Sequence, residues 1–397
     1  MLTSHRIALN PNNVQATYFA KACGVARFAY NWGLAEWKKQ FEAHKQDATH
    51  PKPSEAALRR QLNSMKRQQF PWMLEVTKNA PQMALIQLGQ AFKNFFSGKT
   101  KYPQFRRKGE HDRFTLTNDQ FEVKGSQIRI PHLGWVRMRE TLRFIGKIIT
   151  ATISLVANRW FVSITVEVPD PIPEMKKESV VGVDLGISSL AILSTGEKIP
   201  GPKPHTILLS RLKHFAKALS RKQKGSKNRA KAKTKLARIH ARIANIRLDA
   251  IHKLTTKLVN QFTTICIEDL QVSAMIKNRR LSRSVADMGF HELRRQLEYK
   301  LKRSQGNLIV ADRFFPSSKT CSHCKHVTDE LPLSMRQWTC HHCGMDHDRD
   351  INAARNLAEY AVSSTVKACG GSSSGYTSGS YGETAPLKQE VNTNSYL

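Results

Sequence analysis

The chain has 397 residues, of which 40% are hydrophobic, so it can bury a sizeable core and form two or three structural units. This length excludes a small disulfide scaffold. Lysine and arginine total 63 against 31 acids, a formal charge of +32, and so strong a self-repulsion indicates a polyanionic partner.

The N-terminal part is predicted to contain one strand, a helical segment and a β-rich segment. Residues 4–9 alternate weakly and end at the turn signal Asn10–Asn13, which indicates a short strand. From about Val14 to Phe96, apolar residues recur at three- and four-residue spacing, as in helices. Between Arg113 and Pro169 the period changes to two, with a hairpin turn expected at Ala157–Asn158. The first strand is expected to join this β-rich segment, so that the helical segment is an insertion.

Short strands and a final helix are predicted after an extended proline linker at Pro169, Pro171 and Pro173. Several of these elements begin or end at an acid. They are the strand Val180–Asp184, its hairpin partner Leu190–Leu193, the strands Thr264–Leu270 and Asn307–Ala311, and the helix Ile351–Ala361 with Asp350 at its start. Beyond Lys367 the chain is rich in Gly, Ser and Thr, which predicts a disordered tail.

A long basic segment separates two of these strands. Residues 198–248 contain no acid, and lysines and arginines crowd them. We expect helices held to the core by a thin apolar stripe, which consists of Leu209, Leu212, Leu236, Ile239, Ile243 and Ile246. For a single lysine, a solvated helix face is an equally good interpretation, whereas the whole cluster indicates a polyanion.

Four of the seven cysteines form two close pairs. Cys321 and Cys324 are separated by fifteen residues from Cys340 and Cys343, and this C-x2-C spacing lets two knuckles surround one zinc ion. A closed set of thiolates favours a structural role for the zinc. Two disulfides are the alternative, which fits poorly with a basic intracellular protein. The other cysteines (Cys23, Cys266 and Cys369) are interpreted as buried or free thiols.

Three carboxylates stand out among the few acids of the chain. A single acid at the end of a strand often only caps a turn, but Asp184, Glu268 and Asp350 each lie at the edge of a buried element in basic surroundings. The order strand-Asp, strand-Glu and helix-Asp is what an RNase H-like sheet requires if the acids are to meet at one face. Magnesium prefers such oxygen ligands, and two ions in one site can hydrolyse a phosphodiester. The pattern therefore predicts cleavage of a nucleic-acid strand.

Four motifs together resemble the TnpB family, the compact RuvC-type nucleases of insertion sequences that are related to type V CRISPR effectors. They are Gly182–Gly186, Ile267–Leu270, the paired C-x2-C and Asp348–Asn356. The resemblance covers essentially the whole chain. It implies an RNA-guided endonuclease that cuts double-stranded target DNA beside a short target-adjacent motif, with two Mg²⁺ ions on Asp184, Glu268 and Asp350 and one structural Zn²⁺. Family alignment favours Asp350 over Asp348, and we expect the neighbouring Asp269 to bond backbone or cap a turn.

The same resemblance predicts the domain organisation: an α/β RNase H-like (RuvC) core with an inserted zinc ribbon, and a β-barrel-like wedge domain with an inserted helical lobe. The predicted parts are a wedge domain (1–12 and 110–172), a helical recognition lobe (13–109), a nuclease domain (179–316 and 347–366), a zinc ribbon that binds target nucleic acid (317–346) and a disordered tail (367–397).

Nucleic-acid contacts are predicted in two groups. Lys78, Gln82 and Gln87 of the helical lobe are candidates for reading the bases of the target-adjacent motif. Because base pairing with the guide selects the sequence, the other contacts need charge more than base-reading groups. The candidates for holding phosphate backbones are Arg221, Lys222, Lys224, Arg229, Lys231, Arg279 and Arg280.

Other functions of the same scaffold remain open at this point: a guide-directed repressor without cleavage, an RNA-independent transposase, or a zinc-ribbon RNA-binding protein. The chain lacks an apolar run of roughly 18 residues and a signal peptide, so a membrane partner is not expected. We expect a monomeric ribonucleoprotein in the prokaryotic cytoplasm, associated with the nucleoid.

Overall fold

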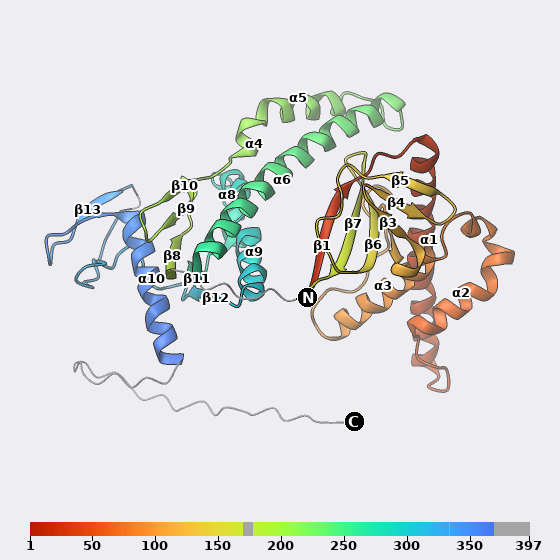
Figure 1. Ribbon diagram of the computed structural model, residues 1–397, viewed down its shortest axis with the longest axis horizontal. Coiled ribbons are helices and arrows are strands. Elements are labelled where there is room, and N and C mark those ends of the chain that lie inside the picture. Colours follow the sequence, from red (N-terminus) through yellow and green to blue (C-terminus); the bar gives the residue numbers. More distant parts are fainter. Residues whose placement is uncertain (170–177, 333, 369–397) are drawn as a thin grey trace.

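A four-stranded antiparallel sheet organises the N-terminal part of the computed structural model, which describes residues 1–169, 178–332 and 334–368 (Figure 1). Its strand order is β1-β7-β6-β2. The predicted first strand and hairpin turn are confirmed, since β1 pairs with β7, and Ala157 and Asn158 have positive φ angles between β6 and β7. The strands are β1 (Leu2–Ala8), β2 (Arg113–Thr117), β6 (Lys147–Val156) and β7 (Arg159–Glu167).

A second, three-stranded sheet and the helices complete this part. An antiparallel bridge between Leu9 and Met138 connects the small sheet to the end of β1. Asn12 begins the first helix with a capping box, in which its side chain accepts from the Gln15 backbone. The small sheet consists of β3 (Glu122–Lys124), β4 (Gln127–Ile130) and β5 (Gly134–Arg137), and the helices are α1 (Asn13–Gln46), α2 (Glu55–Gln69) and α3 (Asn79–Phe96), with 3-10 turns η1 (Pro71–Glu75) and η2 (Asn118–Gln120).

Helices and sheets of the N-terminal part share one hydrophobic core. Phe19 of α1 packs against Phe114 of β2 and Trp160 of β7, with ring centroids 6.1 and 5.1 Å apart. The Trp37 and Phe92 rings stack at 4.1 Å between α1 and α3. Most of the aromatic side chains at helical spacing therefore stabilise packing, as aromatic residues of amphipathic helices usually do.

A five-stranded mixed sheet forms the centre of the C-terminal part. The strand order is β10-β9-β8-β11-β12. Neighbours β8, β11 and β12 run parallel, whereas β9 and β10 pair antiparallel, which confirms the predicted hairpin after Asp184. The strands are β8 (Glu178–Asp184), β9 (Ser189–Leu193), β10 (Lys198–Pro200), β11 (Phe262–Glu268) and β12 (Asn307–Ala311).

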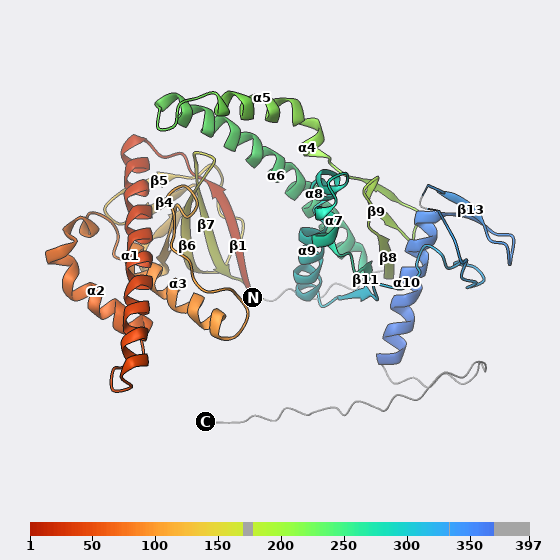
Figure 2. The same cartoon turned by 180° about the vertical axis from the view of Figure 1, so that it is seen from behind.

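Helices cover both faces of this sheet. Ile265 and Ile267 pack in one hydrophobic cluster with α6, α8 and α9, whereas Cys266 packs in another with Leu357 of α10. Figures 1 and 2 accordingly show β8 and β11 between α9 and α10. Burial on both faces explains the nearly continuous apolar runs of these strands. The helices are α6 (Lys227–Gln261), α7 (Val272–Lys277), α8 (Ser282–Met288), α9 (Phe290–Arg303) and α10 (Arg349–Ala368).

The basic segment forms a helical hairpin that extends away from the sheet (Figure 1). It consists of α4 (Pro204–Ile207), α5 (Leu209–Ser220) and the first half of α6. The prediction that its apolar stripe packs on the core is wrong for most of its length, because Leu212 of α5 clusters with Ile239, Ile243 and Ile246 of α6. Only the second half of α6 reaches the sheet, through residues such as Leu254 and Leu258.

The remaining described residues form a small ribbon with β13 (Gln337–Thr339) and β14 (Asp346–Asp348). Helix α10 continues through Ala368, two residues into the segment predicted as a tail. The rest of that tail, including Cys369, and most of the predicted proline linker lie outside the described residues. No helix within the described ranges combines the length and apolar character needed to cross a membrane.

Candidate functional site

Two of the three candidate acids end adjacent parallel strands. Strands β8 and β11 pair in register, with Val183 opposite Ile267. The next residues of the two strands are Asp184 and Glu268. Because the carboxyl ends of parallel neighbours meet at one edge of a sheet, their side chains start from the same edge, where ligands of open α/β sheets generally bind.

Gly182 allows the third acid to approach. A Cβ atom at this glycine would lie 1.9 Å from the Ala354 carbonyl oxygen and 2.4 Å from the Ala358 nitrogen, so α10 packs directly on the backbone of β8. Asp350 precedes Ala354 by four residues, one helical turn, and lies in the first turn of α10. The close approach of helix and strand thus brings the N-terminal end of α10 to the edge that carries Asp184.

Replacing Gly182 with alanine is expected to destabilise the C-terminal part by about 1–3 kcal/mol, because overpacking forces backbone to move. The measurement is the midpoint of thermal unfolding. Gly24→Ala is the matched control, since a Cβ there meets no atom within 4 Å and an alanine favours the helix α1. Equal unfolding midpoints for the two variants would contradict the close packing of α10 on β8.

The carboxylates interact electrostatically. Burial and, to a smaller extent, the charges of Glu268 and Asp350 together raise the pKa of Asp184 to about 8, against the opposing effect of Arg349 and Arg336. An acid held in this way is costly to ionise without a cation. Oxygen donors with negative charge from three elements suit a hard divalent ion such as Mg²⁺, which would relieve this cost.

Asp184→Asn is expected to stabilise the magnesium-free protein at alkaline pH. The Asp184 pKa rises from 3.8 to about 8 on folding, so the folded state retains a proton that the unfolded state releases, and stability falls as the pH rises through this interval. An asparagine at this position does not titrate, so it contributes no such pH dependence to the stability. The difference between the unfolding midpoints of variant and wild type should therefore grow from about pH 4 to pH 8. A difference that stays constant across this range would refute the raised pKa.

Protein donors hold the other carboxylates. Glu268 Oε1 accepts a hydrogen bond from the Ser317 hydroxyl at 2.7 Å, and Asp350 Oδ1 lies 3.1 Å from the Arg336 guanidinium. Asp348 instead caps α10, because its Oδ1 accepts a hydrogen bond from the backbone N–H of Asp350. Ser317 and Arg336 flank the cysteine pairs in sequence, and no sequence motif had indicated their contacts with the acids.

Asp269 departs from its predicted role. Its carboxylate pairs with Arg294 of α9 and with Arg313 after β12, rather than with backbone. These arginines hold the pKa of Asp269 below its usual value. Asp269 therefore connects the end of β11 to two further elements.

The four predicted cysteines come together. Their Sγ atoms all lie within 4.8 Å of one another, close enough to hold one ion. Within the described ranges no other group of three or more Cys, His, Asp or Glu side chains lies this close together, so Asp184, Glu268 and Asp350 interact electrostatically without forming such a group. The Cys321–Cys343 and Cys324–Cys340 sulfur distances are 3.7 and 3.6 Å. Both exceed the ~2.05 Å of a disulfide and match the roughly 3.8 Å edge of a zinc–thiolate tetrahedron with bonds of ~2.3 Å.

His347 supports this cluster from within. Its Nε2 lies 3.0 Å from Cys321 Sγ, and its ring packs on Trp338 with centroids 4.8 Å apart. A hydrogen bond from an imidazole N–H to a ligand thiolate is a typical outer-shell contact of metal sites. The neighbouring His323, His341 and His342 are exposed. The cluster thus fits Zn²⁺ held by thiolates.

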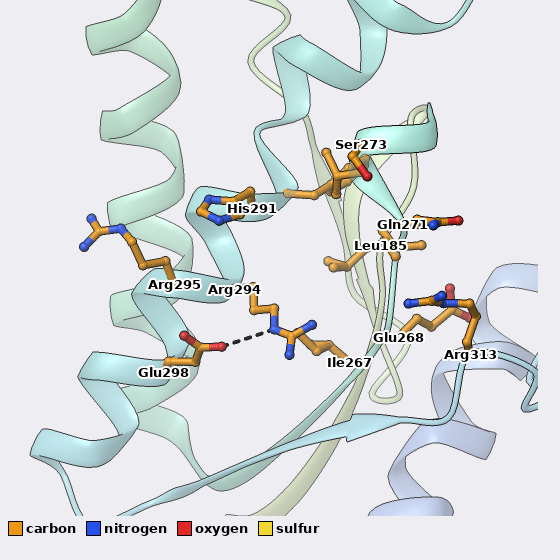
Figure 3. A pocket seen from close by; sticks show the side chains of 13 residues that line it. Leu185, Ile267, Glu268, Gln271, Ser273, His291, Arg294, Arg295, Glu298 and Arg313 are labelled. Atoms are coloured by element: carbon orange, nitrogen blue, oxygen red, sulfur yellow. Dashed lines mark hydrogen bonds and ion pairs between the residues drawn. The ribbon is translucent and has the colours of Figure 1, made fainter. Parts of the chain in front are cut away.

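A cavity of about 530 Å³ adjoins Glu268 on the side of α9 (Figure 3). Glu268 and Arg313 lie at one side of it, and His291 and Arg294 of α9 lie at the other. Arg294 also pairs with Glu298 at 3.1 Å. Of the three acids only Glu268 lines this cavity. Its arginines already pair with carboxylates, Arg294 and Arg313 with Asp269 and Arg295 with Glu292.

The side chains predicted to contact nucleic acid differ in their exposure and in the hydrogen bonds that they make within the protein. Lys78 is exposed at the start of α3, Gln82 is half-buried, and the Gln87 amide bonds Thr115 and Arg106 within the protein. Arg229 is likewise engaged, because its guanidinium donates to the carbonyl of Leu219 in the last turn of α5 and to the carbonyl of Lys222 in the loop that follows. Besides Lys78, the exposed candidates are Arg221, Lys222, Lys224, Lys231, Arg279 and Arg280.

Three family descriptions match parts of the chain. Residues 163–279 match "Probable transposase", residues 290–357 match "Cas12f1-like, TNB domain", and residues 1–46 match "Helix-turn-helix domain". In the structure the last of these ranges folds as β1 and the single long helix α1.

Similar proteins cover most of the chain. A Streptomyces pristinaespiralis protein named "Putative RNA-guided DNA endonuclease" is 39% identical over 91% of this chain and 89% of its own length. "Putative RNA-guided DNA endonuclease InsQ" of Escherichia coli (strain K12) is 31% identical over 93% of this chain and 94% of its own length. A solved "Cas12f1-sgRNA-target DNA complex" covers 87% of this chain and 83% of its own with a TM-score of 0.54 at 17% identity, which shows a similar fold.

Proposed function

Because this chain belongs to the TnpB family, as its relatives show, we propose that it is an RNA-guided endonuclease that cleaves target DNA beside a short target-adjacent motif. The observation that carries the proposal is that Asp184 and Glu268 end adjacent parallel strands at one edge of the mixed sheet, where the charges of Glu268 and Asp350 help to raise the pKa of Asp184. A cluster of carboxylates in so basic a protein favours metal-dependent cleavage of a polyanion over binding alone.

The strand order supports an RNase H-like (RuvC) core. Three antiparallel neighbours, β10, β9 and β8, continue into the parallel strands β11 and β12, with α10 across one face. In this assignment the four-stranded and three-stranded sheets form the wedge domain, and α1, α2 and α3 form the recognition lobe. The boundaries predicted from the sequence remain part of the proposal.

The chemistry follows from the acids and their basic surroundings. Two bound Mg²⁺ ions would supply an activated water and stabilisation of the leaving oxygen. Asp184, Glu268 and Asp350 would hold those ions. The four cysteines would hold a structural Zn²⁺.

The basic hairpin of α5 and α6 is proposed to bind phosphate backbones of the guide RNA or the target DNA. Arg221, Lys222 and Lys224 are exposed near its tip, and residues 198–248 contain no acid that would repel a phosphate. Sequence choice would come from guide pairing, so contacts of this kind need no base specificity. We propose a ribonucleoprotein with one protein copy, located in the cytoplasm.

In the first experiment the protein is expressed together with the DNA that flanks its gene. The nucleic acid that copurifies with the protein is then sequenced. We expect one RNA of defined sequence, because the protein would hold a guide, and we expect the complex to cut plasmids that match the 3′ or 5′ variable part of that RNA. Copurified RNA of random sequence, or cleavage that persists after RNase treatment of the protein, would contradict guide-directed cutting.

An RNA-independent transposase is the second candidate, because the description "Probable transposase" matches residues 163–279. Such an enzyme would join DNA ends in the absence of RNA. The RNase-treated sample in the same experiment distinguishes the two functions.

A further inference from the structure

One hydrogen bond connects a candidate metal ligand to the segment that leads into the first cysteine pair. Ser317 is 5% exposed, and its hydroxyl lies 2.7 Å from Glu268 Oε1. The serine hydroxyl donates and the carboxylate oxygen accepts. Within the described residues, this bond engages Oε1, and the hydrogen bonds of the Glu268 side chain include no contact to Oε2.

Two buried asparagines of α10 hold the Ser317 segment in place. Asn356 is 2% exposed, and its amide donates to the Ser317 carbonyl at 2.8 Å and to the Thr320 carbonyl at 2.6 Å. Asn352 is 1% exposed and also donates to the Thr320 carbonyl, at 2.7 Å, while its Oδ1 accepts from the Ser322 backbone at 2.9 Å. Residues 317–322 are thus tied at several points to the helix that carries Asp350.

We infer that Ser317 is a positioning residue that orients the Glu268 carboxylate for divalent metal, and that the 317–322 segment thereby makes this orientation depend on the folded cysteine ribbon. The inference rests on the proposed nuclease function. A glutamate side chain has several rotatable bonds, and one buried donor at a fixed place restricts them. Mutation of a residue that hydrogen-bonds to a metal ligand commonly lowers metal affinity or activity by about 10- to 100-fold.

A purely structural role is the competing interpretation, because the same hydroxyl could only stabilise the turn before Cys321. The two roles differ in what they change. Loss of a turn contact lowers thermal stability but leaves the affinity for the ion unchanged, whereas loss of a positioning contact weakens ion binding in a protein that remains folded.

The test compares Ser317→Ala, Ser317→Thr and the control Ser318→Ala in the full ribonucleoprotein. Ser318 is the half-buried neighbour, and the described contacts of Glu268 do not include it. Calorimetric titration with Mn²⁺ measures ion affinity, and single-turnover cleavage at increasing Mg²⁺ measures activity. We expect Ser317→Ala to weaken ion binding and to raise the Mg²⁺ concentration for half-maximal rate by roughly 10- to 100-fold. The threonine, which keeps the hydroxyl, should restore both values to within about threefold, and Ser318→Ala should match wild type.

A double-mutant cycle covers the case in which Ser317→Ala also loses stability. If Ser317 acts through Glu268, adding Ser317→Ala to Glu268→Gln should weaken Mn²⁺ binding no further than Glu268→Gln alone. Equal, additive losses in both backgrounds would overturn the inference. So would ion affinity within twofold of wild type for Ser317→Ala while the wild type cleaves DNA. A wild type that binds ions and RNA but does not cut would contradict the proposed function, and the Mn²⁺ cycle would still decide the role of Ser317.

Discussion

Replacing Asp184 with alanine is expected to abolish DNA cleavage while leaving assembly with RNA and binding of the target nearly intact. The side chain lies at the end of β8, where its carboxylate and those of Glu268 and Asp350 interact. Loss of one ligand removes several kcal/mol of transition-state stabilisation, and ~4 kcal/mol corresponds to a rate loss of about 10³-fold. Target binding depends on base pairing and on many distant cations, so it should persist.

The measurement is single-turnover cleavage of a matched plasmid beside a gel-shift assay of target binding. Asp249→Ala is a suitable control, because it removes the same charge from an exposed position of α6, where Asp249 pairs with Lys253. The control should cut at the wild-type rate. Full activity of Asp184→Ala would refute its role as a metal ligand, and parallel loss of binding and cleavage would indicate misfolding instead.

Cys340→Ser is expected to release the zinc and unfold the ribbon. The four sulfur atoms lie within 4.8 Å, and apart from Trp338 and Leu331 the ribbon has few buried apolar side chains. Structural zinc supplies folding free energy of about 10 kcal/mol or more, which so small a core does not replace. Cleavage should also fall, because Ser317 and Arg336, which contact Glu268 and Asp350, flank the two cysteine pairs.

Zinc content by elemental analysis and limited proteolysis of residues 317–348 measure this effect. Cys23→Ala provides the control, since Cys23 is a buried thiol of α1 in the N-terminal core. It should retain one zinc per chain. Unchanged zinc content and protease resistance in Cys340→Ser would show that the cluster does not hold the ribbon together.

Local patterns predicted much of this protein correctly. The period-two segments became strands, the positive φ angles fell at Ala157 and Asn158, and the acids ended β8 and β11 as expected. The family resemblance, drawn from short motifs, is confirmed by relatives at 31–39% identity over most of the chain. Each of these signals lies within a few consecutive residues, where backbone preference and side-chain period act directly.

The errors share a different cause. The apolar stripe of the basic segment was assigned to the core, but α5 packs on α6 because a helical hairpin buries its own stripe as well as a sheet would. Asp269 was expected to bond backbone, yet Arg294 and Arg313 come from later segments to pair with it. Gln87 and Arg229 stay predictions as nucleic-acid contacts, although each already donates a hydrogen bond within the protein, Gln87 to Thr115 and Arg229 to a backbone carbonyl.

The sequence by itself identified the candidate residues: three acids at the ends of apolar elements, four thiols at knuckle spacing and a surplus of positive charge. Only the tertiary structure decided where these residues lie relative to one another. Gly182 admits α10 to the backbone of β8, the parallel register aligns Asp184 with Glu268, and Ser317 reaches Glu268 across 49 positions of the chain. Contacts between distant segments depend on how whole elements pack, and a pattern of neighbouring residues does not contain that information.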